Sequence, residues 1–153
     1  MHYGYIGQGN LGANCACCLL KAGMDVTVTD IDQVAAKPAL DAGAKWADSP
    51  AELAARVDHV ITCLPSPAVS GIVAAEMLPA MRDDAHWIEM STLGRDDVHA
   101  FAAQAAKYDI RMMELPVTGG VHLAAQGKIT MLAGGEKDMF DLHLPALKAM
   151  GDQ

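Results

Sequence analysis

The sequence is poor in positive charge, in aromatic side chains and in long apolar runs. Its 153 residues include 11 Lys and Arg against 19 Asp and Glu, a formal net charge of −8 at pH 7. This balance argues against nucleic acid and against an anionic membrane surface as partners, because no basic cluster could neutralise a run of phosphates. No apolar run reaches the roughly 18 residues of a membrane-spanning helix, and no signal peptide precedes the first apolar segment. We therefore expect a cytoplasmic protein.

Cysteine is scarce as well, with four residues in the chain. Cys15 and Cys18 formally make a C-x-x-C pattern, but a structural zinc site needs a second pair of ligands. Neither cysteine nor histidine supplies one at a suitable spacing. We expect these cysteines to pack as small apolar side chains on a helix, and no metal site is predicted.

A glycine-rich turn stands near the start of the chain. The apolar segment 2–6 ends in G-Q-G-N-L-G at 7–12, the pattern G-x-G-x-x-G, and an apolar-periodic helix follows. Gly7 permits a tight turn, Gly9 leaves the backbone bare for a pyrophosphate, and Gly12 lets the helix pack closely on its strand. The first N–H groups of the helix then face the anion. The alternative is a structural turn without a ligand.

An acidic residue follows the second apolar strand, 25–29. Asp30 lies 18 residues beyond Gly12, about where a carboxylate accepts hydrogen bonds from the adenosine ribose of a dinucleotide. It would repel the 2′-phosphate of NADP, and no basic residue follows before Lys37 to compensate. The sequence therefore favours NAD over NADP as the cofactor. A solvated acid at a strand end is the alternative reading of Asp30.

Strand-like and helix-like segments alternate along the chain. Strands are expected at 2–6, 25–29, 44–46, 59–63, 86–89, 110–113 and 129–133, with helices between them. This alternation predicts an α/β fold with a doubly wound, mainly parallel sheet of the Rossmann type, and the length predicts one domain, 1–153. Ligands bind such sheets beyond the carboxyl ends of the strands. We expect the loops 7–12, 64–67, 91–92 and 116–120 to form one crevice there.

Several motifs carry a resemblance to a known family. The run L-L-K-A-G at 19–23 matches it outright, and L-P at 64–65 corresponds to a family loop. E-M-S-T at 89–92 corresponds to the family motif D-x-S-T. E-L-P-V-T-G-G at 114–120 corresponds to the family motif D-A-P-V-S-G-G. Over nearly its whole length the chain resembles the β-hydroxyacid dehydrogenases, the family of 3-hydroxyisobutyrate dehydrogenase and tartronate semialdehyde reductase.

The resemblance implies an NAD(P)-dependent enzyme that oxidises a short 3-hydroxy acid to its semialdehyde, or does the reverse. Thr92 would lie near the nicotinamide ribose, while Thr118, Gly119 and Gly120 would bind the substrate carboxylate. The predicted cofactor-binding residues are Gly7, Gln8, Gly9, Asn10, Leu11, Gly12, Asp30, Leu64, Pro65 and Thr92.

The family's catalytic motif is missing. Its general acid/base is a lysine followed one helical turn later by asparagine, K-x-x-N, in an all-helical second domain that also forms the dimer. The only asparagines here are Asn10 and Asn14, and neither follows a lysine by three residues. We therefore predict no catalytic residue in this chain. We expect a cofactor domain that binds NAD, is inactive by itself and belongs to a longer enzyme, which would be a homo-oligomer.

The cofactor domain is also compatible with functions other than hydroxy-acid oxidation. Imine reductases share this cofactor domain and differ chiefly in the catalytic residue, although the P-V-T-G-G loop favours hydroxy acids. A 6-phosphogluconate dehydrogenase activity is disfavoured, because the loop lacks cationic partners for a phosphate. A stand-alone, non-catalytic nucleotide-binding module is the third alternative.

Overall fold

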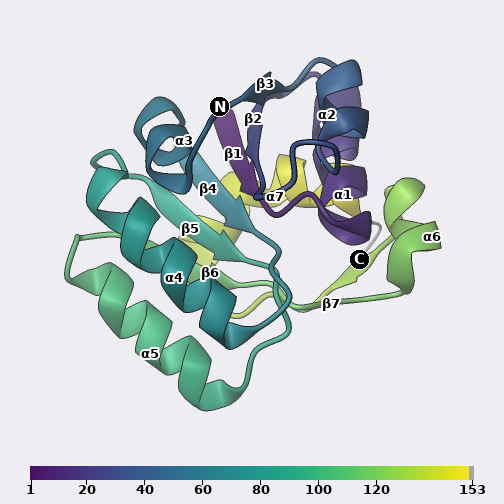
Figure 1. The fold of residues 1–153 in the computed structure, drawn as a ribbon. Coiled ribbons are helices and arrows are strands. Elements are labelled where there is room, and N and C mark those ends of the chain that lie inside the picture. Colours follow the sequence, from purple (N-terminus) through teal and green to yellow (C-terminus); the bar gives the residue numbers. More distant parts are fainter. Residues whose placement is uncertain (152–153) are drawn as a thin grey trace.

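The main sheet has six parallel strands in the order β3-β2-β1-β4-β5-β6 (Figure 1). The computed structural model describes residues 1–151. The strands are β1 (His2–Ile6), β2 (Asp25–Thr29), β3 (Lys45–Trp46), β4 (His59–Thr62), β5 (His86–Glu89) and β6 (Arg111–Glu114). Strand order reverses between β1 and β4, so a crevice opens beyond their carboxyl ends. The predicted doubly wound α/β fold is confirmed.

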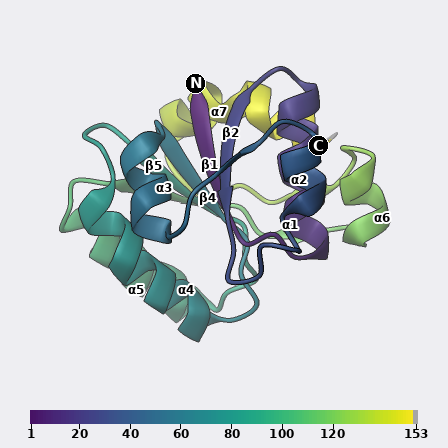
Figure 2. The ribbon, with the colours of Figure 1, turned by 45° about the horizontal axis from the view of Figure 1, so that its top comes forward.

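Helices cover both faces of this sheet. They are α1 (Asn10–Lys21), α2 (Lys37–Asp41), α3 (Pro50–Arg56), α4 (Pro67–Met77), the 3₁₀ turn η1 (Leu78–Ala80), α5 (Arg95–Ala106), α6 (Gly120–Ala125) and α7 (Lys137–Met150). Figure 2 shows α3, α4 and α5 on one side of the sheet and α1, α2 and α6 on the other. Successive strand residues point to opposite faces. Tyr5 and Ile61 accordingly join the core under α1 and α7, whereas Ile6 and Val60 join the core under α3 and α4.

Local sequence signals set several helix starts. The Oγ atom of Ser49 accepts a hydrogen bond from the Glu52 N–H at 3.1 Å and caps α3, and Pro50 occupies the first turn. Ser66 caps α4 in the same way. Helix α2 begins only at Lys37, because Pro38 is accommodated in a first turn and not in a helix interior.

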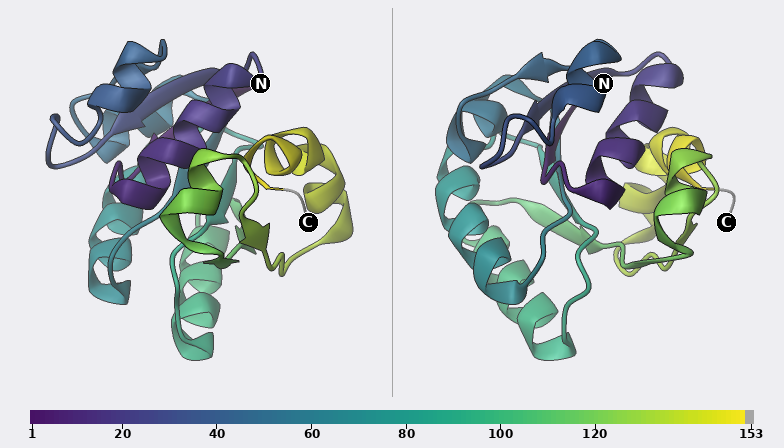
Figure 3. Two further views of the ribbon diagram at one scale, coloured as in Figure 1. Left: turned by 90° about the vertical axis from the view of Figure 1, so that its right-hand side faces the viewer. Right: turned by 45° about the vertical axis from the view of Figure 1, so that its right-hand side comes forward.

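The end of the chain departs from the predicted alternation. β7 (Val117–Thr118) and β8 (Thr130–Met131) pair antiparallel in a separate two-stranded sheet beside the main one (Figure 3). The segment 129–133 was thus correctly expected to contain a strand, but that strand does not join the parallel sheet. The predicted loop 116–120 contains β7 and leads into α6. The partner of β8 is set by contacts that are distant in sequence, so the sheet to which it belongs could not be predicted from the segment itself.

The four cysteines are all free, and Cys15 and Cys18 are buried in the face of α1 that packs on the sheet. For these two the predicted packing role is confirmed. Among residues 1–151, no helix combines the length and apolar character that a membrane span requires.

Candidate functional site

Two of the three loop glycines are explained by the fold itself. Gly7 has φ +96°, and a Cβ atom there would lie 2.2 Å from the carbonyl oxygen of Cys63. A Cβ atom on Gly12 would lie 2.0 Å from the carbonyl oxygen of Gly7. Any side chain at either position would collide with backbone. These glycines allow β1, β4 and α1 to approach closely, as predicted.

The middle glycine has no such structural reason. Gly9 has φ −63°, and a Cβ atom there would meet no atom within 4 Å. It is the N-cap of α1, which has neither a capping side chain nor an acidic residue in its first turn. The first N–H groups of α1 therefore point to an open space, with the positive end of the helix dipole behind them. The space above Gly9 suits an anion that must approach the backbone.

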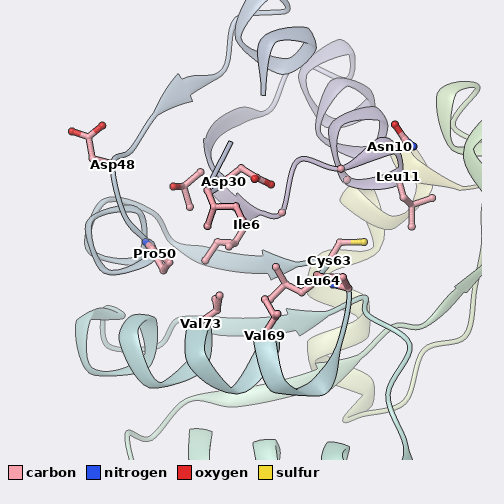
Figure 4. Close-up of a pocket in the computed structure, with 16 residues that line it drawn as sticks. Ile6, Asn10, Leu11, Asp30, Asp48, Pro50, Cys63, Leu64, Val69 and Val73 are labelled. Carbon is pink, nitrogen blue, oxygen red and sulfur yellow. The ribbon is translucent and has the colours of Figure 1, made fainter. Parts of the chain in front are cut away.

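A cavity of about 530 Å³ lies beside this loop, at the carboxyl ends of β1, β2 and β4 (Figure 4). One wall is apolar and comes from the β4–α4 connection and from α4, with Leu64, Val69 and Val73 pointing into it. Its lining residues are Ile6, Gly7, Gly9, Asn10, Leu11, Gly12, Thr29, Asp30, Ile31, Asp48, Pro50, Cys63, Leu64, Pro65, Val69 and Val73.

Two carboxylates supply the charge of this lining. Asp30 accepts a hydrogen bond from the Gln8 N–H at 2.5 Å and one from the Asp32 N–H at 2.9 Å. Asp48 accepts one from the Trp46 indole at 2.7 Å. A carboxylate has about four acceptor positions, so each keeps capacity for hydroxyl donors. No lysine, arginine or histidine belongs to the lining of the cavity.

A buried network ties the β4 loop to the end of β5. The Glu89 Oε1 atom accepts a hydrogen bond from the Ser91 N–H at 2.7 Å, and the Ser91 hydroxyl accepts one from the Leu64 N–H at 2.8 Å. Burial raises the pKa of Glu89, although its hydrogen bonds with Ser91 act in the opposite direction. This network sets the position of Leu64 at the cavity wall.

The predicted cofactor residues fall into two groups. Those that line the cavity are Gly7, Gly9, Asn10, Leu11, Gly12, Asp30, Leu64 and Pro65. Gln8 does not line it: its side chain is buried, and its amide donates to the carbonyl oxygen of Tyr5 at 3.2 Å. Its contribution is the backbone N–H that orients Asp30. Thr92 is exposed and lies outside the lining.

The predicted substrate residues also lie outside this cavity. Thr118 is in β7, Gly119 is the N-cap of α6 with φ +117°, and Gly120 opens α6 with φ +73°. All three are exposed. The cavity therefore joins two of the four loops that were expected to form one crevice, 7–12 and 64–67, and the other two lie beyond its lining.

Eight residues of the lining were not predicted from the sequence: Ile6, Thr29, Ile31, Asp48, Pro50, Cys63, Val69 and Val73. Val69 and Val73 are one turn apart on α4, and Asp48 precedes α3. Ile31, directly after Asp30, is fully exposed despite its large apolar side chain. The i, i+4 pair on α4 could have been found from its spacing, whereas Asp48 lines the same cavity as Asp30 only because β3 pairs with β2.

A family profile, the NAD-binding domain of 6-phosphogluconate dehydrogenase, matches residues 2–153. The chain belongs to this family. The mitochondrial 3-hydroxyisobutyrate dehydrogenase of Drosophila melanogaster is 34% identical over 149 residues, 97% of this chain and 46% of the relative. The structure of Mycobacterium tuberculosis 3-hydroxyisobutyrate dehydrogenase with L-serine has a TM-score of 0.95 at 30% identity, over 99% of this chain and 53% of that one. The predicted resemblance to this group of dehydrogenases is confirmed.

An imine reductase from Myxococcus stipitatus in complex with NADP⁺ shares the fold at 18% identity, with a TM-score of 0.91 over 99% of this chain and 53% of that chain. The chain spans about half the length of the relatives that it matches. It is an NAD(P)-binding domain of a dehydrogenase family. Because the Drosophila relative is mitochondrial by name, the cytoplasmic location stays a prediction.

Proposed function

We propose that this chain is the cofactor-binding part of a dehydrogenase that transfers a hydride between NAD and a short 3-hydroxy acid. The observation that carries the proposal is Gly9, the one loop glycine that protein packing does not require. A dinucleotide pyrophosphate over Gly9 would explain it. The backbone N–H groups of Asn10 and Leu11, at the N-terminus of α1, would bind the phosphate oxygens.

The rest of the cavity suits the adenosine half of the same molecule. Asp30 would accept hydrogen bonds from the ribose hydroxyls, and Leu64 and Pro65 would line the adenosine. The exposed Ile31 side chain would cover the opposite side and lose its contact with water. Burial of an isoleucine contributes roughly 1.5–3 kcal/mol when complete, so this contact would be a substantial part of the affinity.

The charges of the lining favour NAD over NADP. A 2′-phosphate on the adenosine ribose would lie near Asp30 and Asp48, and no basic side chain of the lining would offset the repulsion. The hydrogen bond from the 2′-hydroxyl to a carboxylate would be lost as well, because NADP carries the phosphate in place of that hydroxyl.

The reacting end of the cofactor would lie beyond the cavity, toward β5 and β7. NAD, when bound, takes up or gives a hydride at its nicotinamide ring. Thr92 would then lie near the nicotinamide ribose. The Thr118 hydroxyl and the N–H groups of Gly119 and Gly120 would bind the substrate carboxylate. These residues orient the reactants, and their exposure suits a surface that another part of the enzyme covers.

Oxidation of the substrate also requires a base that accepts the proton of its hydroxyl group. In the family this base is the lysine of the K-x-x-N motif, which residues 1–153 do not contain. We propose that a lysine in an all-helical part of the enzyme, outside residues 1–153, performs this transfer and that this part also forms a homo-oligomer. General acid–base catalysis typically contributes about 10²–10⁴ in rate. The chain by itself would therefore bind NAD and turn over little or nothing.

The test is a fluorescence titration of the 153-residue chain with NADH and with NADPH. Asp30→Ala should abolish the preference for NADH and weaken its binding. Asp25→Ala is the matched control, because Asp25 is exposed at the opposite end of the same strand. If the wild-type chain bound neither dinucleotide, or if both variants behaved alike, the proposed cofactor site would be wrong.

A further test addresses the substrate class. A full-length enzyme that carries this domain should oxidise 3-hydroxyisobutyrate or a similar 3-hydroxy acid with NAD. Reduction of cyclic imines in place of hydroxy-acid oxidation would favour the imine reductase alternative. The likeness to imine reductases is one of fold alone, whereas the P-V-T-G-G loop at 116–120 favours hydroxy acids.

A further inference from the structure

Three histidines from three separate elements meet at the end of the sheet opposite the cavity. His59 opens β4, His86 opens β5, and His143 lies in α7. One ring nitrogen from each lies within 4.8 Å of the other two. The side chains are 7%, 4% and 0% exposed, so the group is almost fully removed from water. Buried histidines are uncommon enough that three together call for a physical reason.

Strand register brings the cluster together. Tyr3 of β1 is paired with His59, and His86 is paired with Arg111 of β6. His59 and His86 lie side by side on adjacent strands, because the residues that follow them, Val60 and Trp87, are paired between β4 and β5. All four side chains point to the face that α7 covers, and His143 closes the cluster from above. The imidazoles of His59 and His86 therefore lie side by side on the sheet and face the imidazole of His143 on α7.

The hydrogen bonds of the cluster assign a tautomer to each ring. The Arg111 Nη2 atom donates to His86 Nε2 at 2.9 Å, so the proton of His86 is on Nδ1 and is donated to His143 Nε2 at 2.9 Å. His143 Nδ1 then donates to the Tyr3 hydroxyl at 2.9 Å. His59 Nδ1 accepts from the backbone N–H of His86 at 3.1 Å. All three imidazoles are therefore neutral.

Burial favours the neutral form as well. It lowers the pKa of His59 to about 4, with His86 adding to the shift. It lowers the pKa of His143 to about 3, with His59 and His86 adding to the shift. For His86, burial and then Arg111 lower the pKa. Neutral imidazole is the form that binds metal ions, so few protons compete for these nitrogens at neutral pH.

We propose that His59, His86 and His143 form a binding site for one divalent transition-metal ion, Zn²⁺ foremost. Imidazole nitrogen is a preferred ligand of Zn²⁺, and three histidines are a known ligand set for it. The bond from His143 to Tyr3 already orients His143 with Nε2 toward the cluster, as an outer-shell partner does in metal sites. The ion would connect the starts of β4 and β5 to α7.

The ion would have to replace existing contacts. The bond between His86 Nδ1 and His143 Nε2 would break, and the proton of His86 would move to Nε2. His59 would bind through Nδ1, its only free lone pair, and this atom would give up the hydrogen bond from the His86 N–H. Arg111 Nη2 would then have to leave His86. Its Nη1 atom is bonded to Glu136 at 2.7 Å and to Asp138 at 2.8 Å, so the guanidinium has carboxylates to hold it while it turns away. Arg111 is thus the competitor of the ion.

The first test is a titration of the chelator-treated chain with Co²⁺, followed by visible absorption, and with Zn²⁺, followed by the thermal unfolding midpoint. We expect saturation at one ion per chain and a higher midpoint, because an ion that binds only the folded state stabilises it. The Co²⁺ spectrum should show ligand-field bands without the intense near-ultraviolet band of thiolate ligands. No saturable binding would overturn the proposal, as would a thiolate band, which would assign the ion to the cysteines.

Variants make the test specific. Tyr3→Phe, which removes only the outer-shell partner of His143, should weaken binding about 10- to 100-fold. His143→Phe should weaken it further, whereas Arg111→Met should strengthen it by removing the competitor. His99→Phe is the control, because His99 is exposed on α5. Unchanged affinity in His143→Phe and in His59→Phe, with native circular dichroism in both, would contradict the site.

Discussion

The backbone N–H of Gln8 donates to the Asp30 carboxylate at 2.5 Å, so the glycine loop itself holds the acid that ends β2. A second donor, the N–H of Asp32, fixes the other carboxylate oxygen at 2.9 Å. The carboxylate is therefore oriented by two main-chain groups before a ligand arrives. Such preorganisation lowers the entropic cost of binding. It also joins the two halves of the proposed cofactor site, the phosphate loop and the ribose acid.

Asp48, the second carboxylate of the cavity, should lower the affinity for NADPH without changing the affinity for NADH. Asp48→Asn keeps an oxygen that can accept from the Trp46 indole and removes one negative charge. Removal of the repulsion between the Asp48 carboxylate and the 2′-phosphate of NADPH should be worth about 1 kcal/mol. The affinity for NADPH should therefore rise roughly five-fold. NADH affinity should stay within about two-fold. Titrations with both dinucleotides at low and high salt would measure this, and Asp25→Asn should change neither affinity.

Substitution of Gly9 should reduce NADH binding, whereas substitution of Gly12 should reduce the stability of the fold. Gly9→Ala should fold with nearly unchanged stability, since its Cβ atom meets nothing within 4 Å, yet it should lose most NADH affinity. Gly12→Ala places a Cβ atom 2.0 Å from the Gly7 carbonyl oxygen and should lose about 1–3 kcal/mol of stability. Urea unfolding and NADH titration of both variants would measure the difference. A destabilised Gly9→Ala that still bound NADH normally would contradict this assignment.

The contact between Ser91 and Leu64 should stabilise the cavity wall. Ser91→Ala leaves the Leu64 N–H without its 2.8 Å acceptor and should cost about 1–3 kcal/mol of stability. Because Leu64 lines the cavity, NADH affinity should also fall. Thr92→Ala is the neighbouring control for stability alone: Thr92 is exposed, so its loss should leave the free energy of unfolding unchanged. Thermal unfolding and NADH titration would be compared, and equal stability of the two variants would count against the network.

The histidine cluster should make the fold sensitive to acid. The folded pKa values of His59 and His143, about 4 and about 3, lie below the ordinary value of 6.5. Between those values the unfolded chain binds more protons than the folded one, so stability is complete above about pH 6.5 and falls as the pH drops. Each of these histidines should lower the free energy of unfolding by roughly 1–2 kcal/mol as the pH falls from 7 to 5.

Urea unfolding of the metal-free chain from pH 7 to pH 5 would measure this loss. Other charges act on the same residues: Asp58 opposes the shift of His59, and Arg111 adds to that of His143. Glu89 contributes in the opposite direction, since its raised pKa favours the folded state as the pH falls. His143→Phe should therefore be compared with wild type at each pH. An equally steep pH dependence in that variant would refute the role of the cluster.

Local signals were sufficient for most of the fold. The glycine turn before α1 and the strands expected at 2–6, 25–29 and 59–63 depend on interactions between close neighbours in sequence, and each was predicted correctly. The core of the candidate site was likewise readable, because the glycine loop and Asp30 follow their strands directly. β7 and the antiparallel pairing of β8 with it were not predicted, since this pairing forms through contacts distant in sequence.

What the sequence alone determined is the doubly wound fold, the glycine loop and the acid at the end of β2, because hydrophobic periodicity and turn geometry are properties of neighbouring residues. Only the tertiary structure decided three things: that Asp48 joins Asp30, that Gly9 faces open space, and that His143 meets His59 and His86. The first depends on the pairing of β2 with β3, the second on the loops around the cavity, and the third on the pairing of β4 with β5 and on the packing of α7. Those are set by the packing of the whole core, which no local pattern encodes.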